Sequence, residues 1–168
     1  PYEMCHVMRA VGHGKTEFCV HYCGWETGLN PRVQGMYLHA VNDMAIQNLG
    51  AVRRFFDRSE SVGRRYLSIF PLELAKRDNN SGKIRIKVKD SPKSPTWTAA
   101  GTDTAKLSAD TEIQVWDDVV PQSDAREPTA REDRISTLFG TFTTRQRKKR
   151  SFTLLVVTTW HVNDAIMH

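Results

Sequence analysis

The 168-residue sequence has few cysteines and no long apolar segment. Its three cysteines, at positions 5, 19 and 23, cannot all pair with one another, which excludes a disulfide framework and favours a reducing compartment such as the cytoplasm. No window approaches the ~18 apolar residues of a membrane-spanning helix, and the N-terminus lacks the charged-then-apolar order of a signal peptide. We therefore expect no membrane partner. The first residue, Pro1, is consistent with a removed initiator, release from a precursor or a segment of one.

Signatures of catalysis are also scarce. The sequence contains no Gly-x-Ser-x-Gly nucleophile elbow. The segment Gly12–Thr16 ends like a phosphate-binding loop, but Arg9 occupies the position of the first consensus glycine, and the residues that follow predict a strand where such a loop needs a helix. Asp117 and Asp118 are expected on opposite faces of a strand or in a turn. We therefore interpret the glycine-rich segment as a turn and expect neither enzyme activity nor a cofactor.

A metal site is a secondary hypothesis. Cys19, His21 and Cys23 are the candidate ligands, and zinc prefers such thiolates and imidazoles. On the strand predicted for Thr16 to Trp25, however, the two cysteines would be ~13 Å apart, too far to share one ion. No Cys-x-x-Cys pair is present. We expect no metal, and interpret the thiols as small apolar groups packed in a sheet.

Two-residue alternation predicts most of the secondary structure. The clearest strand is Lys83 to Lys89, with Ile84, Ile86 and Val88 facing inward. Four further segments are expected to be strands: Thr16 to Trp25, Arg65 to Phe70, Glu112 to Trp116 and the central Phe152 to His161. Ile135 to Thr144 favours β structure, and Asp117 to Arg134 is expected to be a long loop. We therefore predict a mainly β fold, an antiparallel β-sandwich of jelly-roll type with one or two short helices. It would form one domain over residues 1–168, either a compact jelly roll or the later part of a longer one.

One helix is expected, from about Asn42 to Arg58. Apolar residues recur there at three- and four-residue spacing, which is the pattern of a helix with one buried face. The stripe consists of Val41, Ala45, Leu49, Val52 and Phe56.

The net charge of +5 comes from a single tract. Residues 145–150 carry five positive charges, and without them the remaining 19 basic residues equal the 19 acidic ones. The tract is open to three interpretations: a solvated hairpin turn, a contact to nucleic-acid phosphates, or a processing site for a basic-specific protease. The candidate nucleic-acid-binding residues are this tract and the outward face of the cationic strand: Arg145, Arg147, Lys148, Lys149, Arg150, Arg85, Lys87 and Lys89.

The segment Asn42 to Phe55 resembles capsid proteins of picorna-like viruses of invertebrates and plants. In that family a similar run, acidic residue, Ile-x-Ser/Asn-Leu/Phe, aliphatic residue and arginines, precedes the later strands of a jelly roll. The matching positions are Asp43, Ile46, Asn48, Leu49, Val52, Arg53 and Arg54. The resemblance implies a structural subunit of an icosahedral shell, with basic residues near packaged RNA and no catalytic residues.

The expected function is therefore a capsid or similar shell subunit. Its partners would be other copies or sister coat subunits and genomic RNA, in the virion and, during assembly, in the host cytoplasm. Opposite charge in two segments also suits neighbours that dock together: residues 53–93 hold twelve basic and five acidic residues, and residues 103–133 hold nine acidic and three basic. The alternatives are a nucleic-acid-binding module of a ribonucleoprotein that uses residues 145–150, and a small metalloenzyme around Cys19, His21 or Cys23.

Overall fold

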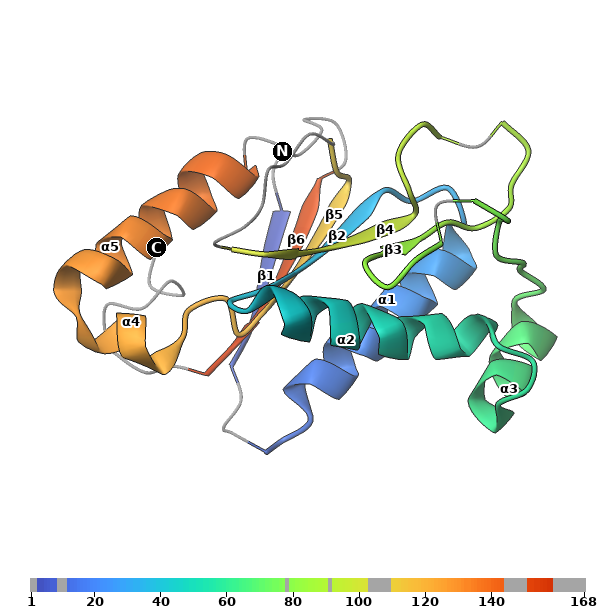
Figure 1. The fold of residues 1–168 in the computed structure, drawn as a ribbon, viewed down its shortest axis with the longest axis horizontal. Coiled ribbons are helices and arrows are strands. Elements are labelled where there is room, and N and C mark those ends of the chain that lie inside the picture. The colour runs from blue at the N-terminus through green and yellow to red at the C-terminus, as the bar shows by residue number, and fades with distance from the viewer. Residues whose placement is uncertain are drawn as a thin grey trace.

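The computed structural model describes residues 3–8, 12–77, 79–90, 92–102, 110–143 and 151–158, and within these a six-stranded sheet forms the centre of the molecule (Figure 1). The strand order is β1-β6-β5-β2-β4-β3, and all neighbours are parallel except β3 and β4. The strands are β1 (Glu3–Met8), β2 (Gly35–His39), β3 (Lys83–Ile84), β4 (Trp97–Gly101), β5 (Ile113–Asp117) and β6 (Phe152–Val157).

Helices cover both faces of this sheet (Figure 1). On one face lie α1 (Lys15–Leu29), α2 (Asn42–Arg53), the short 3-10 helix η1 (Arg54–Phe56) and α3 (Ser61–Ile69). On the other lie α4 (Gln122–Arg126), α5 (Pro128–Thr137) and η2 (Leu138–Phe142). The two hydrophobic clusters follow this division: Tyr37, Val115 and Leu154 belong to the first, and Leu38, Trp116 and Leu155 to the second. The molecule is thus a three-layer α/β/α structure.

The central strands are apolar on both sides because both faces are covered, as is usual for parallel sheets. All five residues of β5 are buried, as are five of the six in β6. Where β2 and β4 lie side by side, the ring of Trp97 covers Gly35, and a Cβ at that glycine would come within 2.3 Å of the ring. The indole nitrogen of Trp97 donates a hydrogen bond to the Thr27 hydroxyl of α1 at 2.8 Å, which anchors the end of that helix to the sheet.

The predicted antiparallel β-sandwich is wrong. The main error is the segment Thr16 to Trp25, which is part of helix α1. Its buried residues follow helical spacing, and the apparent alternation arose because large apolar side chains also lie on its exposed side, among them Phe18 and Trp25. With this helix between β1 and β2, the chain shows the strand–helix–strand alternation that is typical of a parallel sheet.

Three other predicted elements differ from the structure. Residues 65–70 form the second half of α3 and its end, and residues 135–143 continue α5 into η2. The expected long loop from Asp117 holds α4 and most of α5. In the predicted strand of residues 83–89, only Lys83–Ile84 pairs as a strand.

Three predictions are confirmed. The helix from Asn42 is α2, extended by η1, and its apolar stripe lies in the core except for Val41, which is 52% exposed. The strand at residues 112–116 is β5, and β6 is central, between β1 and β5, although its predicted end lies outside the described residues.

Candidate functional site

Four functional side chains meet where parallel strands end. Lys15 opens α1 after the turn that follows β1, Asp117 ends β5, Asp118 comes next, and Thr158 follows β6. Ligands of open α/β sheets bind at the carboxyl ends of the strands, next to the starts of the following helices. The edge that carries these four residues is therefore the candidate site.

Lys15 lies at the centre of this group although it is a buried cation. Only 6% of the residue is exposed. Its Nζ lies 3.6 Å from Asp118 Oδ2 and donates a hydrogen bond to the Thr158 hydroxyl. The turn before it contains two glycines with left-handed backbone, Gly12 (φ 79°) and Gly14 (φ 69°), a conformation that side chains other than glycine rarely adopt. A strand, a glycine turn and a helix that begins with lysine thus follow one another.

Asp117 is held by groups from two other elements. The Tyr37 hydroxyl of β2 donates a hydrogen bond to its Oδ2 at 2.7 Å, and the Asn48 amide of α2 donates to the same oxygen at 3.3 Å. Burial raises the pKa of Asp117, while Tyr37 and the Thr16 hydroxyl at the start of α1 oppose the increase. The second oxygen, Oδ1, is buried and accepts no hydrogen bond of normal geometry within the described part of the chain.

Asp118 connects the ends of three strands. It adopts a left-handed backbone (φ 44°), and its amide donates to the Val156 carbonyl at 3.0 Å. Its Oδ1 accepts the Thr158 amide at 3.1 Å, and its own carbonyl accepts the Ala40 amide at 3.3 Å. The backbone of Asp118 thus departs from the extended conformation of β5, and its carboxylate contacts Lys15.

The donor set suits a divalent cation that is bound together with an anionic ligand. Among the described residues, no group of three or more His, Cys, Asp or Glu side chains lies together as a cation cage. The buried Oδ1 of Asp117 and the nearby Thr16 hydroxyl offer two oxygen ligands. Mg²⁺ is commonly held by one or two carboxylates, with the remaining ligands from water and substrate phosphates. The oxygens of Asp117 and Thr16 therefore fit this ion.

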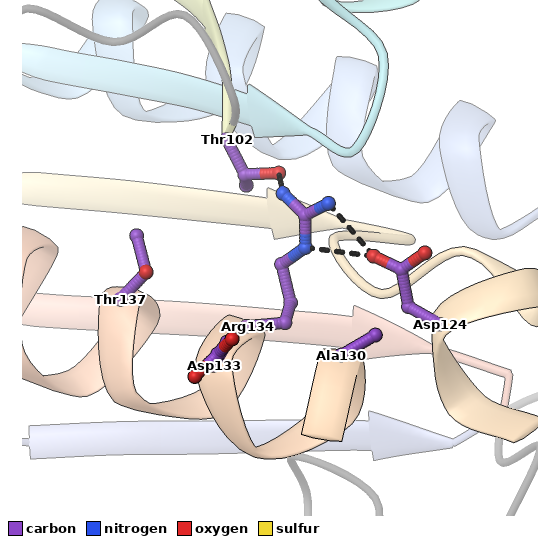
Figure 2. A pocket seen from close by; sticks show the side chains of 6 residues that line it. All are labelled: Thr102, Asp124, Ala130, Asp133, Arg134 and Thr137. Carbon is purple, nitrogen blue, oxygen red and sulfur yellow. Dashed lines mark hydrogen bonds and ion pairs between the residues drawn. The ribbon is translucent and has the colours of Figure 1, made fainter. Parts of the chain in front are cut away.

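A polar pocket of about 400 Å³ lies on the opposite face of the sheet (Figure 2). Arg134 of α5 lies between two partners: its Nη2 and Nε contact Asp124 Oδ2 at 2.7 and 3.1 Å, and its Nη1 donates to the Thr102 hydroxyl at 2.6 Å. The Thr102 amide in turn donates to the His39 carbonyl at 3.1 Å. Asp124, Arg134 and Thr102, which we call the Arg134 clamp, therefore connect α4 and α5 to the end of β4 and, through the Thr102 amide, to β2. Both helices follow Asp118 in the chain.

The residues predicted to bind nucleic acid have different surroundings. Residues 145–150 lie outside the described residues. Arg85 is buried, and its guanidinium donates to the carbonyls of Pro92 and Lys93 at 2.6 Å each, so it does not face solvent as expected. Lys87 and Lys89 are exposed, and Lys87 pairs with Glu73 at 2.9 Å. Their role in nucleic-acid binding remains a prediction.

The secondary metal hypothesis does not fit the structure. Cys19 and Cys23 lie one turn apart on α1 and are fully buried, whereas His21 is exposed on another side and contacts the ring of Phe55. Burial raises the pKa of both thiols, Cys19 and Cys23, which opposes the thiolate form that zinc requires. The expected packing of these cysteines in the core is confirmed, although on a helix and not on a strand.

Sequence reasoning missed Lys15 as a functional residue because the predicted strand after it excluded a phosphate-binding loop. The structure removes this objection, because a helix follows Lys15 as a phosphate-binding loop requires. Arg9 still departs from the consensus glycine. Asp117 and Asp118 were also missed as site residues, because they were expected on opposite faces of a strand or in a turn. Their signal was present as a predicted strand, Glu112 to Trp116, that is followed directly by two carboxylates. Nothing in the sequence indicated the bonds from Tyr37 and Asn48.

These features define the class of the fold as an open, mainly parallel α/β sheet with a lysine-bearing turn after its first strand. Solved structures that share the fold include two phage proteins. One is the ATPase domain of the large terminase of Thermus phage P74-26, with a TM-score of 0.54 and 17% identity over 93% of this chain and 58% of that one. The other is the N-terminal domain of the DNA packaging ATPase of bacteriophage phi29, with a TM-score of 0.54 and 15% identity over 96% of this chain and 74% of that one.

The chain thus spans a little over half the length of the terminase domain. No protein-family model and no curated protein matches it. The likeness overturns the resemblance to picorna-like capsid proteins, because the segment of Asn42 to Phe55 is a helix on a parallel sheet in this fold and no part of a jelly roll. With that resemblance the icosahedral shell function is also withdrawn. The expectation that the chain is not an enzyme is contradicted as well, since both neighbours are ATPases.

Proposed function

We propose that this chain is a nucleoside-triphosphate-hydrolysing unit of a viral DNA-packaging motor. The observation that carries the proposal is that the start of α1 meets the end of β5, with Lys15 against Asp118 and Thr16 against Asp117. A helix N-terminus with free amides and a lysine is suited to phosphate oxygens, and a buried carboxylate two strands away is suited to the accompanying cation. The two neighbours, an ATPase domain of a terminase and a DNA packaging ATPase, support the same activity.

Each residue has a defined task in this proposal. The Nζ of Lys15 leaves Asp118 and Thr158 to contact the terminal phosphates of the bound nucleotide. Asp117 Oδ1 and the Thr16 hydroxyl would hold Mg²⁺, which would supply charge neutralisation on the phosphates. Asp118, released from Lys15, accepts the proton of the water that attacks the terminal phosphorus. The bond from that phosphorus to the bridging oxygen breaks, and the products are the diphosphate and inorganic phosphate.

Binding of DNA is the second part of the proposal. One neighbour is the DNA packaging ATPase of bacteriophage phi29, and the chain has exposed lysines, Lys87 and Lys89, that can contact phosphates without sequence preference. We assign this contact to the residues predicted from sequence, the tract 145–150 with Lys87 and Lys89. Arg85 is left out, because its guanidinium is bound to main-chain carbonyls.

The chain would still act in a viral assembly, but in the DNA-packaging motor and not as a subunit of the capsid. Both neighbours are phage proteins, so the chain would act in an infected host cell, on viral DNA and not on genomic RNA. No helix in the described ranges is long and apolar enough to cross a membrane.

Nucleotide binding by the purified chain tests the proposal directly. We expect a fluorescent ATP analogue to bind in the presence of Mg²⁺ and to be displaced by ATP and ADP. Unlabelled ATP would also raise the melting temperature of the chain, because a ligand that binds only the folded state stabilises it. A chain that shows neither effect at millimolar nucleotide is not an ATPase of this kind.

A further inference from the structure

The carboxylate of Asp117 is oriented by two residues from outside the loop and the strand that form the proposed nucleotide site. Tyr37 belongs to β2 and Asn48 to α2, and both direct their donors at the same atom, Asp117 Oδ2. Asp117 and Tyr37 are fully buried and Asn48 is 7% exposed. Two donors on one oxygen fix the rotation of the carboxylate.

The other oxygen, Oδ1, is thereby left for a ligand. It is buried and lacks a hydrogen bond of normal geometry within the described residues, while the Thr16 hydroxyl acts on the same carboxylate from the start of α1. Burying an unpaired polar atom has a cost in folding free energy, and such an atom in a native structure indicates a function. A bound cation would satisfy it.

We propose that Tyr37 and Asn48 are positioning residues that present Asp117 Oδ1 to the divalent cation of a bound nucleotide. This inference rests on the proposed nucleotide site, and it names residues that neither touch the nucleotide nor belong to the glycine turn. Both act through Asp117. Loss of a group that orients a metal ligand in this way typically lowers metal affinity about 10- to 100-fold.

The substitution Tyr37→Phe tests the inference, because it removes one hydroxyl and keeps the ring in the core. We expect the concentration of Mn²⁺ needed to half-saturate the nucleotide-bound chain, followed by electron paramagnetic resonance, to rise about 10- to 100-fold. Binding of the nucleotide in EDTA, which depends on Lys15 and the turn, stays as in the unsubstituted chain. Asn48→Ala is expected to act in the same direction, and the double variant to exceed either.

Tyr66→Phe is a matched control. The Tyr66 hydroxyl also donates a partly buried hydrogen bond at 2.7 Å, to the carbonyl of Gly24, but it lies away from Asp117. We expect this variant to lose a similar amount of stability and to keep the Mn²⁺ affinity of the unsubstituted chain.

The outcomes separate the two proposals. If the unsubstituted chain binds nucleotide and cation, and Tyr37→Phe binds Mn²⁺ equally well, the positioning role is refuted while the nucleotide site stands. The same holds if Tyr66→Phe weakens Mn²⁺ binding as much as Tyr37→Phe. An unsubstituted chain that binds no nucleotide overturns the proposed function, and the inference that rests on it falls with it.

Discussion

Lys15 Nζ lies 3.6 Å from Asp118 Oδ2, and this contact joins the start of α1 to the end of β5. The lysine is almost fully buried, and the Asp118 side chain is about one third exposed, with 35% of its surface accessible. A buried ammonium group needs a partner, so the carboxylate neutralises Lys15 when no phosphate is bound. A phosphate would replace the carboxylate, which would then be free to act as a base.

Replacing Lys15 by alanine tests this exchange. We expect the affinity for ATP to fall about 10- to 100-fold, which corresponds to the loss of one or two charge-assisted hydrogen bonds. Equilibrium binding of a fluorescent analogue measures the effect, and Lys83→Ala, at an exposed lysine on β3, is the control. Equal affinity of Lys15→Ala and the unsubstituted chain would remove Lys15 from the site.

Replacing Asp117 by asparagine is expected to raise the melting temperature of the ligand-free chain. The pKa of Asp117 is raised, chiefly by burial, so ionisation of this carboxyl opposes folding. The asparagine oxygen can still accept the bonds from Tyr37 and Asn48. The loss of folding stability caused by this ionisation begins near pH 4, the ordinary pKa of an aspartate. It reaches its full size once the pH exceeds the raised pKa of Asp117 in the folded chain. The difference in stability between the two proteins should therefore be present at pH 7 and vanish below about pH 4.

The same Asp117→Asn variant is expected to lose Mg²⁺-dependent nucleotide binding, because a neutral amide is a poor ligand for this ion. Thermal unfolding with and without ATP and Mg²⁺ measures both properties in one experiment. A variant that is less stable than the parent at pH 7, and equally stabilised by the nucleotide, would contradict the assignment of this carboxylate.

The clamp of Arg134 is expected to contribute to stability. The side chains of Arg134 and Asp124 are 14% and 21% exposed, so Arg134→Ala leaves a poorly solvated carboxylate without its partner. We expect a loss of about 2 kcal/mol in the free energy of unfolding, measured by urea denaturation. Arg126→Ala, at an exposed position on the neighbouring helix, should change it by less than about 0.5 kcal/mol. Equal effects of the two substitutions would show that the clamp is dispensable.

DNA binding is expected to depend on salt through the basic residues assigned to it. Replacing Arg147, Lys148 and Lys149 together by alanine should lower the slope of log affinity against log salt by about 0.9 for each phosphate that is no longer neutralised. The pair Lys87→Ala and Lys89→Ala tests the second surface in the same way, with Arg126→Ala as the control. An unchanged slope in both multiple variants would refute the assignment of DNA binding to these residues.

Thiol reactivity should distinguish Cys5 from the other two cysteines. Cys5 is exposed, whereas Cys19 and Cys23 are fully buried and have raised pKa values because of that burial. The folded chain is expected to react rapidly through one thiol with an aromatic disulfide reagent, and through three after denaturation. Cys5→Ser should abolish the rapid reaction. Rapid reaction of two or three thiols in the folded chain would contradict the packing of α1.

A helix could be predicted from the sequence where its apolar residues lie on one face only. Residues 42–53 show a single apolar stripe, and they form a helix as expected. In α1 the period is obscured because exposed positions also carry large apolar side chains, with Phe18 42% and Trp25 53% accessible. The strands β5 and β6 were recognised, but their parallel pairing depends on contacts between distant segments, which alternation does not specify.

The site was predictable only in part, for the same physical reason. The glycine turn and the two aspartates are visible as local motifs. Had a helix been predicted after Lys15, a parallel sheet would have followed, with the turn and the aspartates at the same edge of it. Tyr37 lies 80 residues from Asp117, and its hydroxyl reaches the carboxylate only because β2 and β5 are neighbours in the sheet. Arg85 shows the opposite error, since alternation placed it in solvent while the 92–93 segment folds over its guanidinium.

The anchoring of Thr27 by Trp97 has a mechanical consequence for the other end of the same helix. Since Gly35 leaves room for the Trp97 indole against β2, and the indole donates a hydrogen bond to Thr27, this contact opposes movement of that end of α1 along the sheet. In the proposed function, a change of partner at Lys15 would fall on the turn before it, where Gly12 and Gly14 adopt left-handed backbone. The rest of α1 would keep its place, and the change would reach α4 and α5 through Asp118, which precedes them in the chain.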